Sequence, residues 1–314
     1  MNKIQGARGK GQGSISEVFT CPLSLASCNS AGFTLVEMVM VIVITGIIGS
    51  MIAVFLRAPI QQYLDVSRRA ELTDIADTAL FRLASDISVA VPNSLRTAGC
   101  GATPCIEFLP TKDGGRYRGN VVGGGGGCGM NGDELNFAAQ DPCFEIIGPP
   151  TTFAAGDHVV IGSTQSDGAP AYDQTASSGV LRAYTGVPGV QSAVTIAATQ
   201  FPAFARLSGQ RFDVVDGAQQ AVTFSCEGTL GTLDVNGNGQ GRLLKHWGYG
   251  FNAAQAAPAA LGGQSALLAD KVSGCVMDYA VTNQRLGLLG VRLTLTSGNE
   301  TVSLYHEIHV NNVP

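Results

Sequence analysis

The sequence predicts an α+β protein in which one long amino-terminal helix packs on a mostly antiparallel β-sheet head. Three observations predict this fold. An apolar run covers residues 33–56, an amphipathic pattern follows it, and short alternating segments separated by Gly, Pro, Asn and Asp fill the rest of the 314 residues. The expected organisation, in chain order, is an amino-terminal segment over 1–32, an apolar helix over 33–59, an amphipathic helix over 60–92 and a disulfide-containing β-rich head over 93–314.

The charge distribution separates a basic end from an acidic body. The net charge of the chain is −5. Residues 1–32 carry Lys3, Arg8 and Lys10 against Glu17, a balance of +2, which leaves −7 for the other 282 residues. An acidic body argues against a nucleic-acid partner, because phosphate binding requires clustered positive charge.

The apolar run is long enough to cross a membrane. Its 24 residues would form a helix of about 36 Å, against about 30 Å for a hydrocarbon core. A secretory signal peptide is the alternative, but its small-residue cleavage site should follow the apolar run, and none stands at the right distance after Leu56. The polar-to-apolar boundary between Gly32 and Phe33 is the better candidate for processing.

Glu37 is the one charged residue in this run. A carboxylate inside a bilayer costs about 2.5–3.5 kcal/mol, so we expect it to have a partner or a function. A cut after Gly32 would create an amine four residues away, on the same chain or on a neighbouring helix. The alternative is that Glu37 reaches the membrane surface from its place near the helix end.

An amphipathic helix is expected to follow Pro59 and to end near Pro92, because the residue before a proline avoids helical geometry. A single helix from Phe33 to Val91 would have 59 residues and a length of about 88 Å. A free-standing coiled coil is less favoured, because the spacing departs from heptads. The apolar positions are Ile60, Leu64, Leu72, Ile75, Ala79, Leu80, Leu83 and Ile87.

Ten short segments after residue 93 are expected to be strands. The last two should form a hairpin across "SGNE", with Leu293, Leu295, Val302 and Leu304 on its inner face. The segments are 105–109, 134–138, 158–162, 179–184, 193–197, 211–215, 221–226, 275–281, 288–296 and 301–310.

The cysteines suggest disulfides in an oxidising compartment. Cys21 and Cys28 precede the apolar run, and six cysteines follow it. Zinc is disfavoured, because no close Cys pair is accompanied by a second pair or by spaced histidines. The spacing suggests three bridges, without proving their connectivity: Cys100–Cys105, Cys128–Cys143 and Cys226–Cys275.

The segment "DVNGNGQG" matches the first half of a calcium loop. Asp234, Asn236 and Asn238 offer oxygens at alternate positions, and Gly239 permits the turn. The acid required at loop position twelve is replaced by Lys245. Calcium is thus a weakly supported cofactor, and a plain Asn/Gly-rich turn is the alternative.

An enzyme is disfavoured. The five glycines at 123–127 lack the Lys and Ser/Thr of a phosphate-binding loop, and no catalytic serine or metalloprotease motif is present. His306 and His309 would point to opposite faces of a strand, so they do not combine as metal ligands. No catalytic residue is assigned.

The segment "GFTLVEMVMVIVITGIIGSMIAVFL" resembles the amino terminus of type IV pilins and of the pseudopilins of type II secretion. The resemblance implies a pilin-like fold and a leader over residues 1–32 that prepilin peptidase cuts after Gly32. It also implies that Phe33 is N-methylated and that Glu37 pairs with the amino terminus of a neighbouring subunit. Two features depart from the family: the leader is long, and Pro59 lies later than the proline of many pilins.

The carboxyl-terminal sequence is further similar to biogenesis proteins of the mannose-sensitive haemagglutinin (MSHA) pilus, of the MshO kind, which are related in plan to pseudopilin J. This implies a minor pilin that assembles or primes a pilus. The implied partners are other pilins, prepilin peptidase, the inner-membrane assembly machinery and membrane lipid, with the head in the periplasm before incorporation into a surface fibre. The alternatives are a minor pseudopilin of type II secretion and, less favoured, a membrane-anchored periplasmic binding protein.

Overall fold

The structure is a computed structural model that describes residues 32–119, 132–165, 168–175, 178–207, 209–279 and 287–312. The chain divides into two units, Met1–Pro59 and Ile60–Pro314, and each is described by itself.

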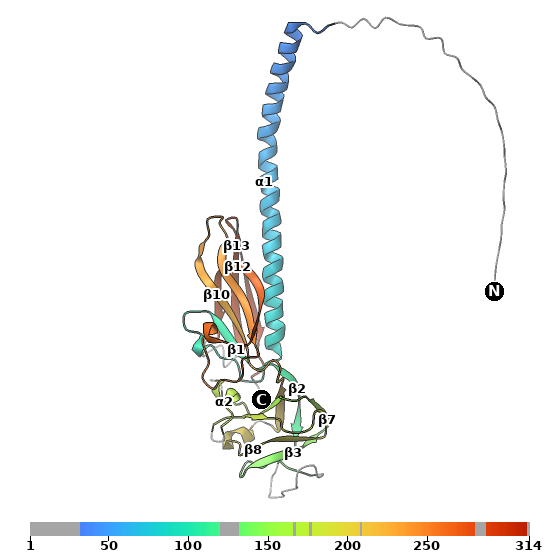
Figure 1. The fold of residues 1–314 in the computed structure, drawn as a ribbon, viewed down its shortest axis with the longest axis vertical. Coiled ribbons are helices and arrows are strands. Elements are labelled where there is room, and N and C mark those ends of the chain that lie inside the picture. Colours follow the sequence, from blue (N-terminus) through green and yellow to red (C-terminus); the bar gives the residue numbers. More distant parts are fainter. Residues whose placement is uncertain are drawn as a thin grey trace, which may run out of the picture. The chain divides into compact units, whose positions relative to one another are not determined.

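Helix α1 extends from Leu35 to Ser88 and has 54 residues (Figure 1). It begins after Thr34, whose hydroxyl accepts a hydrogen bond from the Glu37 backbone N–H at 3.2 Å and so satisfies one of the free donors of the first turn. The helix continues through Pro59. The expected single long helix is therefore present, two residues shorter at its start and three at its end.

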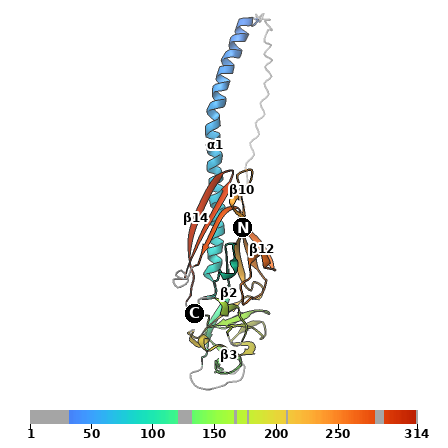
Figure 2. The same ribbon diagram turned by 90° about the vertical axis from the view of Figure 1, so that its left-hand side faces the viewer.

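In the second unit, helix α1 packs on a six-stranded antiparallel sheet (Figure 2). Leu72, Ala76, Leu83 and Ile87 are buried against it, at the three- and four-residue spacing of one helix face. The strands, in spatial order, are β1 (Cys105–Phe108), β10 (Val222–Leu233), β11 (Gly239–Trp247), β12 (Gln264–Asp278), β13 (Leu288–Ser297) and β14 (Glu300–His309).

The hairpin of β13 and β14 is confirmed. Ser297 pairs with Glu300, and the two residues between them, Gly298 and Asn299, both have positive φ, as a tight hairpin turn requires. Leu293 and Leu295 are fully buried, whereas Val302 and Leu304 are partly buried against the same core.

A second sheet has a separate hydrophobic core centred on aromatic residues such as Tyr117, Phe144 and Phe212. A two-stranded ribbon of β4 (Thr151–Phe153) and β7 (Gly189–Gln191) accompanies it. The six strands, in spatial order, are β6 (Leu181–Ala183), β5 (His158–Ile161), β9 (Arg211–Val215), β2 (Thr111–Tyr117), β3 (Asp141–Ile147) and β8 (Ala193–Thr199).

Short helices occupy the connections of the head. One α-helical turn, α2, covers Ala169–Tyr172. In the part of the head that the structure describes, 3₁₀ turns cover Ala98–Cys100, Ala203–Leu207 and Pro258–Ala260.

One expected strand is wrong, and several observed strands were not expected. Residues 134–138 form no strand, and Leu135 makes only an isolated bridge with Gly119. Strands β2, β3, β4, β7 and β11 were missed. Residues 280 and 281 of the expected strand 275–281 lie outside the described residues, and β12 begins earlier, at Gln264.

Candidate functional site

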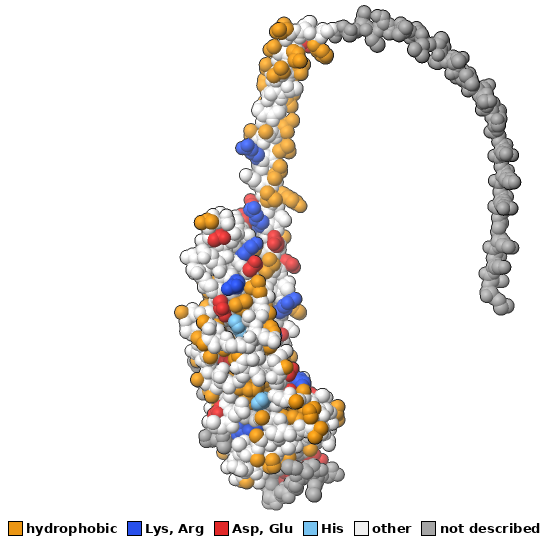
Figure 3. All heavy atoms as spheres, in the orientation of Figure 1, with side chains coloured by type: hydrophobic (Ala, Val, Ile, Leu, Met, Phe, Trp, Pro, Cys, Tyr) orange, Lys and Arg blue, Asp and Glu red, His pale blue; other side chains and the backbone are white. Residues whose placement is uncertain are grey.

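The described part of the first unit is an uncovered apolar helix. Every described residue from Gly32 to Arg57 is exposed, including Phe33 at 79% and Leu35 at 80%. Its best 18-residue window has a mean hydropathy of 2.7, enough by length and composition to cross a membrane. Figure 3 shows apolar side chains along this part of the helix. Water would solvate such a surface poorly, so it requires lipid or other apolar helices around it.

Hydroxyl groups within the apolar segment are satisfied by the helix itself. The Thr45 hydroxyl donates to the Val41 carbonyl at 2.7 Å, and the Ser50 hydroxyl donates to the Ile47 carbonyl at 2.8 Å. No described side chain pairs with the Glu37 carboxylate. Among the described residues of this segment, Glu37 is therefore the polar side chain that has no partner within one copy of the chain.

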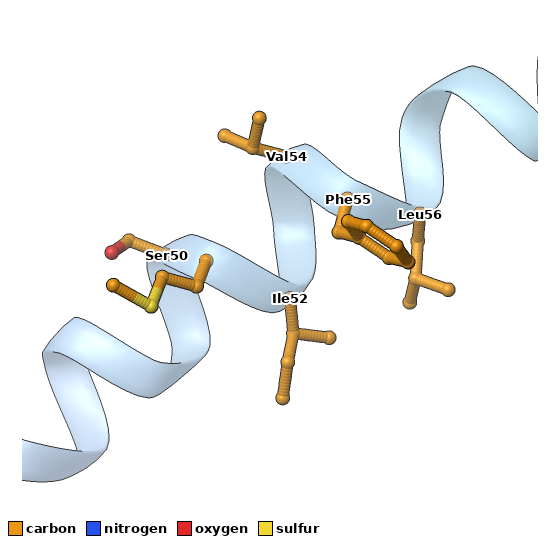
Figure 4. A pocket seen from close by; sticks show the side chains of 6 residues that line it. Ser50, Ile52, Val54, Phe55 and Leu56 are labelled. Atoms are coloured by element: carbon orange, nitrogen blue, oxygen red, sulfur yellow. The ribbon is translucent and has the colours of Figure 1, made fainter.

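A shallow apolar hollow lies farther along the segment, and Figure 4 shows its side chains. All of them come from one helix and project outward around it, so the hollow has no second wall. It is an open helix surface rather than a ligand cavity. The residues are Ser50, Met51, Ile52, Val54, Phe55 and Leu56.

The start of this helix can be compared with known families. Residues 27–53 match the prokaryotic N-terminal methylation motif. The chain thus carries a type IV pilin-like leader with a methylation motif, followed by a long helix whose later half packs on an antiparallel sheet, and pilin-like proteins are structural rather than enzymatic. No match to the chain was found among curated proteins or among solved structures.

The residues expected at the processing point lie within the matched range. A Cβ added at Gly32 would meet no atom within 4 Å, and Phe33 is exposed. Glu37 lies in the first turn of α1. Cleavage and methylation themselves stay predictions.

Two of the three expected disulfides lie within the described residues. Cys100 is bonded to Cys105, with Cα atoms 5.4 Å apart, and Cys226 of β10 is bonded to Cys275 of β12. The Cys128–Cys143 pairing and the glycine run at 123–127 lie outside the description, because residues 120–131 are not described.

The expected calcium segment forms the turn between β10 and β11. One carboxylate oxygen of Asp234 accepts the backbone N–H groups of Asn236 and Asn238, at 2.9 and 2.7 Å, and the other accepts the Asn238 amide. The Asn238 side-chain oxygen accepts from the Ser297 hydroxyl and the Gly298 N–H. The Asn238 backbone N–H, together with the Asn238 side-chain amide and the Asn236 backbone N–H, holds the pKa of the Asp234 carboxyl below its usual value. The geometry favours the plain turn, and calcium stays a prediction.

We expect the variant Asp234→Ala to have a lower melting temperature than the parent protein, because three hydrogen bonds to its carboxylate disappear. Calcium and chelator should leave the melting temperature of the parent protein unchanged. A calcium-dependent rise that Asp234→Ala abolishes would instead establish the metal site.

A hydrogen-bonded cluster around His246 lies on the first sheet. His246 Nε2 is 2.9 Å from Glu227 Oε1 and 3.1 Å from the Ser225 hydroxyl. Both partners meet the same ring nitrogen, whereas a nucleophilic triad requires the acid on the opposite nitrogen. This arrangement is a structural hydrogen-bond network on β10 and β11.

A buried ion pair that the sequence did not reveal joins the two halves of the head. Arg96 Nε donates to Glu107 Oε2 at 2.8 Å, and both side chains are almost fully buried. The Arg96 guanidinium lies 3.5 Å from the ring centre of Tyr172, which belongs to the second core. The Tyr249 hydroxyl donates a hydrogen bond to the other Glu107 oxygen at 2.9 Å. Burial, and after it the charge of Glu107, raises the pKa of this phenol.

Asp213 of β9 makes the stability of the head depend on pH. Burial raises the pKa of its carboxyl to about 6, while the charge of Arg211 opposes the shift. The folded state thus binds this proton more tightly than the unfolded state does. Stability from this group is present below about pH 4 and is lost as the pH rises through about 6.

We therefore expect Asp213→Asn to raise the unfolding free energy of the head by about 1–2 kcal/mol above pH 6, because the amide carries no charge to desolvate. Near pH 4 the same substitution should change the unfolding free energy little. Urea unfolding at a series of pH values measures this difference. The exposed substitution Asp270→Asn serves as the control. A difference between parent and Asp213→Asn that does not vary with pH would contradict the assignment.

Proposed function

We propose that the protein is a minor, accessory type IV pilin that takes part in assembling or priming a pilus of the MSHA type. The observation that carries the proposal is the apolar helix, which bears a methylation motif and is uncovered over every described residue from Gly32 to Arg57. The large two-sheet head suits an accessory subunit better than a repeating shaft subunit.

Processing explains why an acid is retained at the start of the helix. Prepilin peptidase cuts after Gly32, and the new amino terminus at Phe33 is methylated and remains positively charged. The Glu37 carboxylate of one subunit meets this amine of a neighbour in a low-dielectric helix bundle. There a charge-assisted hydrogen bond offsets the cost of burying each ion.

The same helix serves two environments in succession. Before assembly it spans the inner membrane as a single pass, with the head in the periplasm, where the Cys100–Cys105 and Cys226–Cys275 bridges are stable. The assembly machinery then extracts it into a fibre, in which helices of other pilins replace lipid around it. The partners are thus lipid, prepilin peptidase, the inner-membrane machinery and other pilins.

A minor pseudopilin of type II secretion, related in plan to pseudopilin J, is the second candidate, because the methylation motif is shared by both systems. Surface fibres sheared from intact cells discriminate the two. We expect the protein in the sheared fibre fraction, together with the pilin that forms the shaft. Its absence there, combined with an export defect when its gene is deleted, would favour the secretion system.

A membrane-anchored periplasmic binding protein is the third candidate. It would need a ligand cavity in the head. Three hollows lined by described head residues are small open grooves of about 250–300 Å³. This candidate also predicts a mature chain that keeps residues 1–32.

A further inference from the structure

Strand β14 is an open edge of the first sheet (Figure 2). Its ten residues pair with β13 in an unbroken register from Glu300 to His309, without a bulge. The strand contains no proline and no lysine, which are residues that commonly block an exposed edge. It therefore presents a long and regular row of backbone groups to its surroundings.

The register shows which backbone groups of β14 lack a partner. The Val310 N–H donates to the Gly287 carbonyl, so these two residues form a hydrogen-bonded pair of the antiparallel ladder. Every second residue of β14 then also bonds to β13, whereas the residues between them direct their N–H and C=O groups outward. The outward residues are all exposed, and no described backbone group bonds to them: Thr301, Ser303, Tyr305, Glu307 and His309.

The other edges of the two six-stranded sheets are closed within the described residues. At the opposite edge of the first sheet, Glu107 of β1 exchanges two backbone hydrogen bonds with Arg96 of the preceding loop, at 2.9 and 3.0 Å. In the second sheet, Tyr184, next to β6, bridges Ile196 of β8 and so links the two edge strands. A free edge is a template for pairing with another chain, and β14 is the edge that this fold leaves uncovered.

The side chains of β14 define the strand that fits this edge. Val302 and Leu304 face the core but are only partly buried, so apolar residues on an added strand would cover them. Glu307 lies on the other face of the sheet and is exposed. It accepts a hydrogen bond from the Tyr305 hydroxyl at 3.0 Å, and no described Lys or Arg pairs with it. A complementary strand thus has Lys or Arg opposite Glu307 and apolar residues three and five positions away.

A second copy of the chain does not meet these requirements. Strand β14 contains neither Lys nor Arg, so a copy would bring another Glu307 and no cation. Direction also opposes self-pairing. Arg69 of α1 pairs with Glu300 at the start of β14. Asn93, beyond the end of α1, bonds to Asn312, which follows β14. The strand and the helix therefore run in the same direction, and antiparallel pairing of two β14 strands would reverse one helix relative to the other.

We propose that the open edge of β14 binds an extended segment of a different subunit of the fibre, which joins the first sheet as an added strand. Backbone hydrogen bonds to the outward groups supply affinity, and the contacts at Val302, Leu304 and Glu307 supply selectivity. The inference rests on the proposed function, because that function places the heads of other subunits beside this one. One edge accepts one strand, which agrees with an accessory subunit.

Photo-crosslinking in cells that assemble the fibre tests the strand pairing. A benzophenone amino acid replaces Thr301, Ser303 or Tyr305 in turn, and mass spectrometry locates the linked residue of the partner. All three positions should react with one segment of a different fibre subunit. The linked residue should move by about two positions at each step, because paired strands advance residue by residue. No product, a product with a second copy of this chain, or links scattered over several segments would overturn the proposal.

Ser303→Pro tests the backbone contact. It removes an outward N–H and leaves the hydrogen bonds to β13 in place, so it should lower the yield of the cross-link from position 301 about tenfold. Ser303→Ala is the matched control, because it keeps the N–H and should leave the yield unchanged. The melting temperature of each full-length variant in detergent shows whether it folds. An unchanged yield in a folded Ser303→Pro variant contradicts the strand pairing.

Glu307→Lys tests the charge and does not depend on a proline. It places a cation opposite the expected Lys or Arg of the partner and should lower the same cross-link yield about tenfold. Asp270→Lys is its control, because Asp270 is an exposed acid on β12, two strands away from β14. Equal yields for Glu307→Lys and for the parent protein would rule out the proposed partner chemistry.

The outcome separates this contact from the proposed function. A chain that is cut after Gly32 and enters fibres, yet gives no cross-link from β14, overturns the strand addition and leaves the function in place. A chain that is never cut overturns both.

Discussion

Glu37→Ala is expected to leave membrane insertion intact and to reduce incorporation into fibres about tenfold or more. Removing the carboxylate makes the helix more apolar, so insertion does not suffer. In the assembled bundle, however, the methylated amine of a neighbour would be buried without its partner, which is strongly unfavourable at low dielectric. Immunodetection of the protein in membrane and sheared-fibre fractions measures the two quantities separately.

Thr45→Ala is the matched control for this variant. Among the described residues, the Thr45 hydroxyl bonds to carbonyls of its own helix, so its loss should alter neither fraction. Equal incorporation of Glu37→Ala and of the parent protein would contradict the pairing of Glu37 with an amine.

Arg96→Met is expected to destabilise the head by about 3–5 kcal/mol, because Glu107 would keep its buried charge and lose its cation. For a domain of this size, that corresponds to a fall in melting temperature of roughly 10 °C. The guanidinium also donates to the carbonyls of Ala253 and Asn252, so the connection between the two cores should loosen as well. Calorimetry of the full chain in detergent measures the change.

The double variant Arg96→Met with Glu107→Met distinguishes the charge from the packing. It should be less destabilised than Arg96→Met alone, since no unpaired ion remains. The exposed control Arg82→Met should change stability by less than about 0.5 kcal/mol. A double variant as unstable as the sum of the two single variants would show that the pair is not coupled.

The parts of the fold that could be predicted from the sequence are those that depend on residues close together in the chain. The long helix is readable because its apolar spacing and its limits near Gly32 and Pro92 are local features of the chain. The β13–β14 hairpin is readable because Gly298 and Asn299 suit the positive φ of its turn. The methylation motif is likewise confined to a short stretch, residues 27–53.

The missed strands lack these local signals. Strand β2 contains Gly114 and Gly115 and no apolar alternation, because the partner strand approaches closely: a Cβ on Gly115 would lie 2.9 Å from the ring of Phe212. Strand β3 contains Pro142. Only the tertiary pairing shows that these segments belong to a sheet.

The buried polar groups were also beyond sequence reasoning. Arg96 and Glu107 are paired through an antiparallel bridge between a loop and β1, and Tyr172 comes from the other half of the head. Nothing in their spacing indicates that they meet. The segment at Asp234 shows the reverse case, in which a calcium-like spacing folds into a turn whose oxygens already accept hydrogen bonds.

After processing, the helix is expected to keep its whole length and to begin with a charged amine near Glu37. Mass spectrometry of the protein isolated from its native host tests it most directly. We expect a mature chain that begins at a methylated Phe33 and retains the whole of α1. A chain that keeps residues 1–32, or one that begins after the apolar segment, would contradict the account.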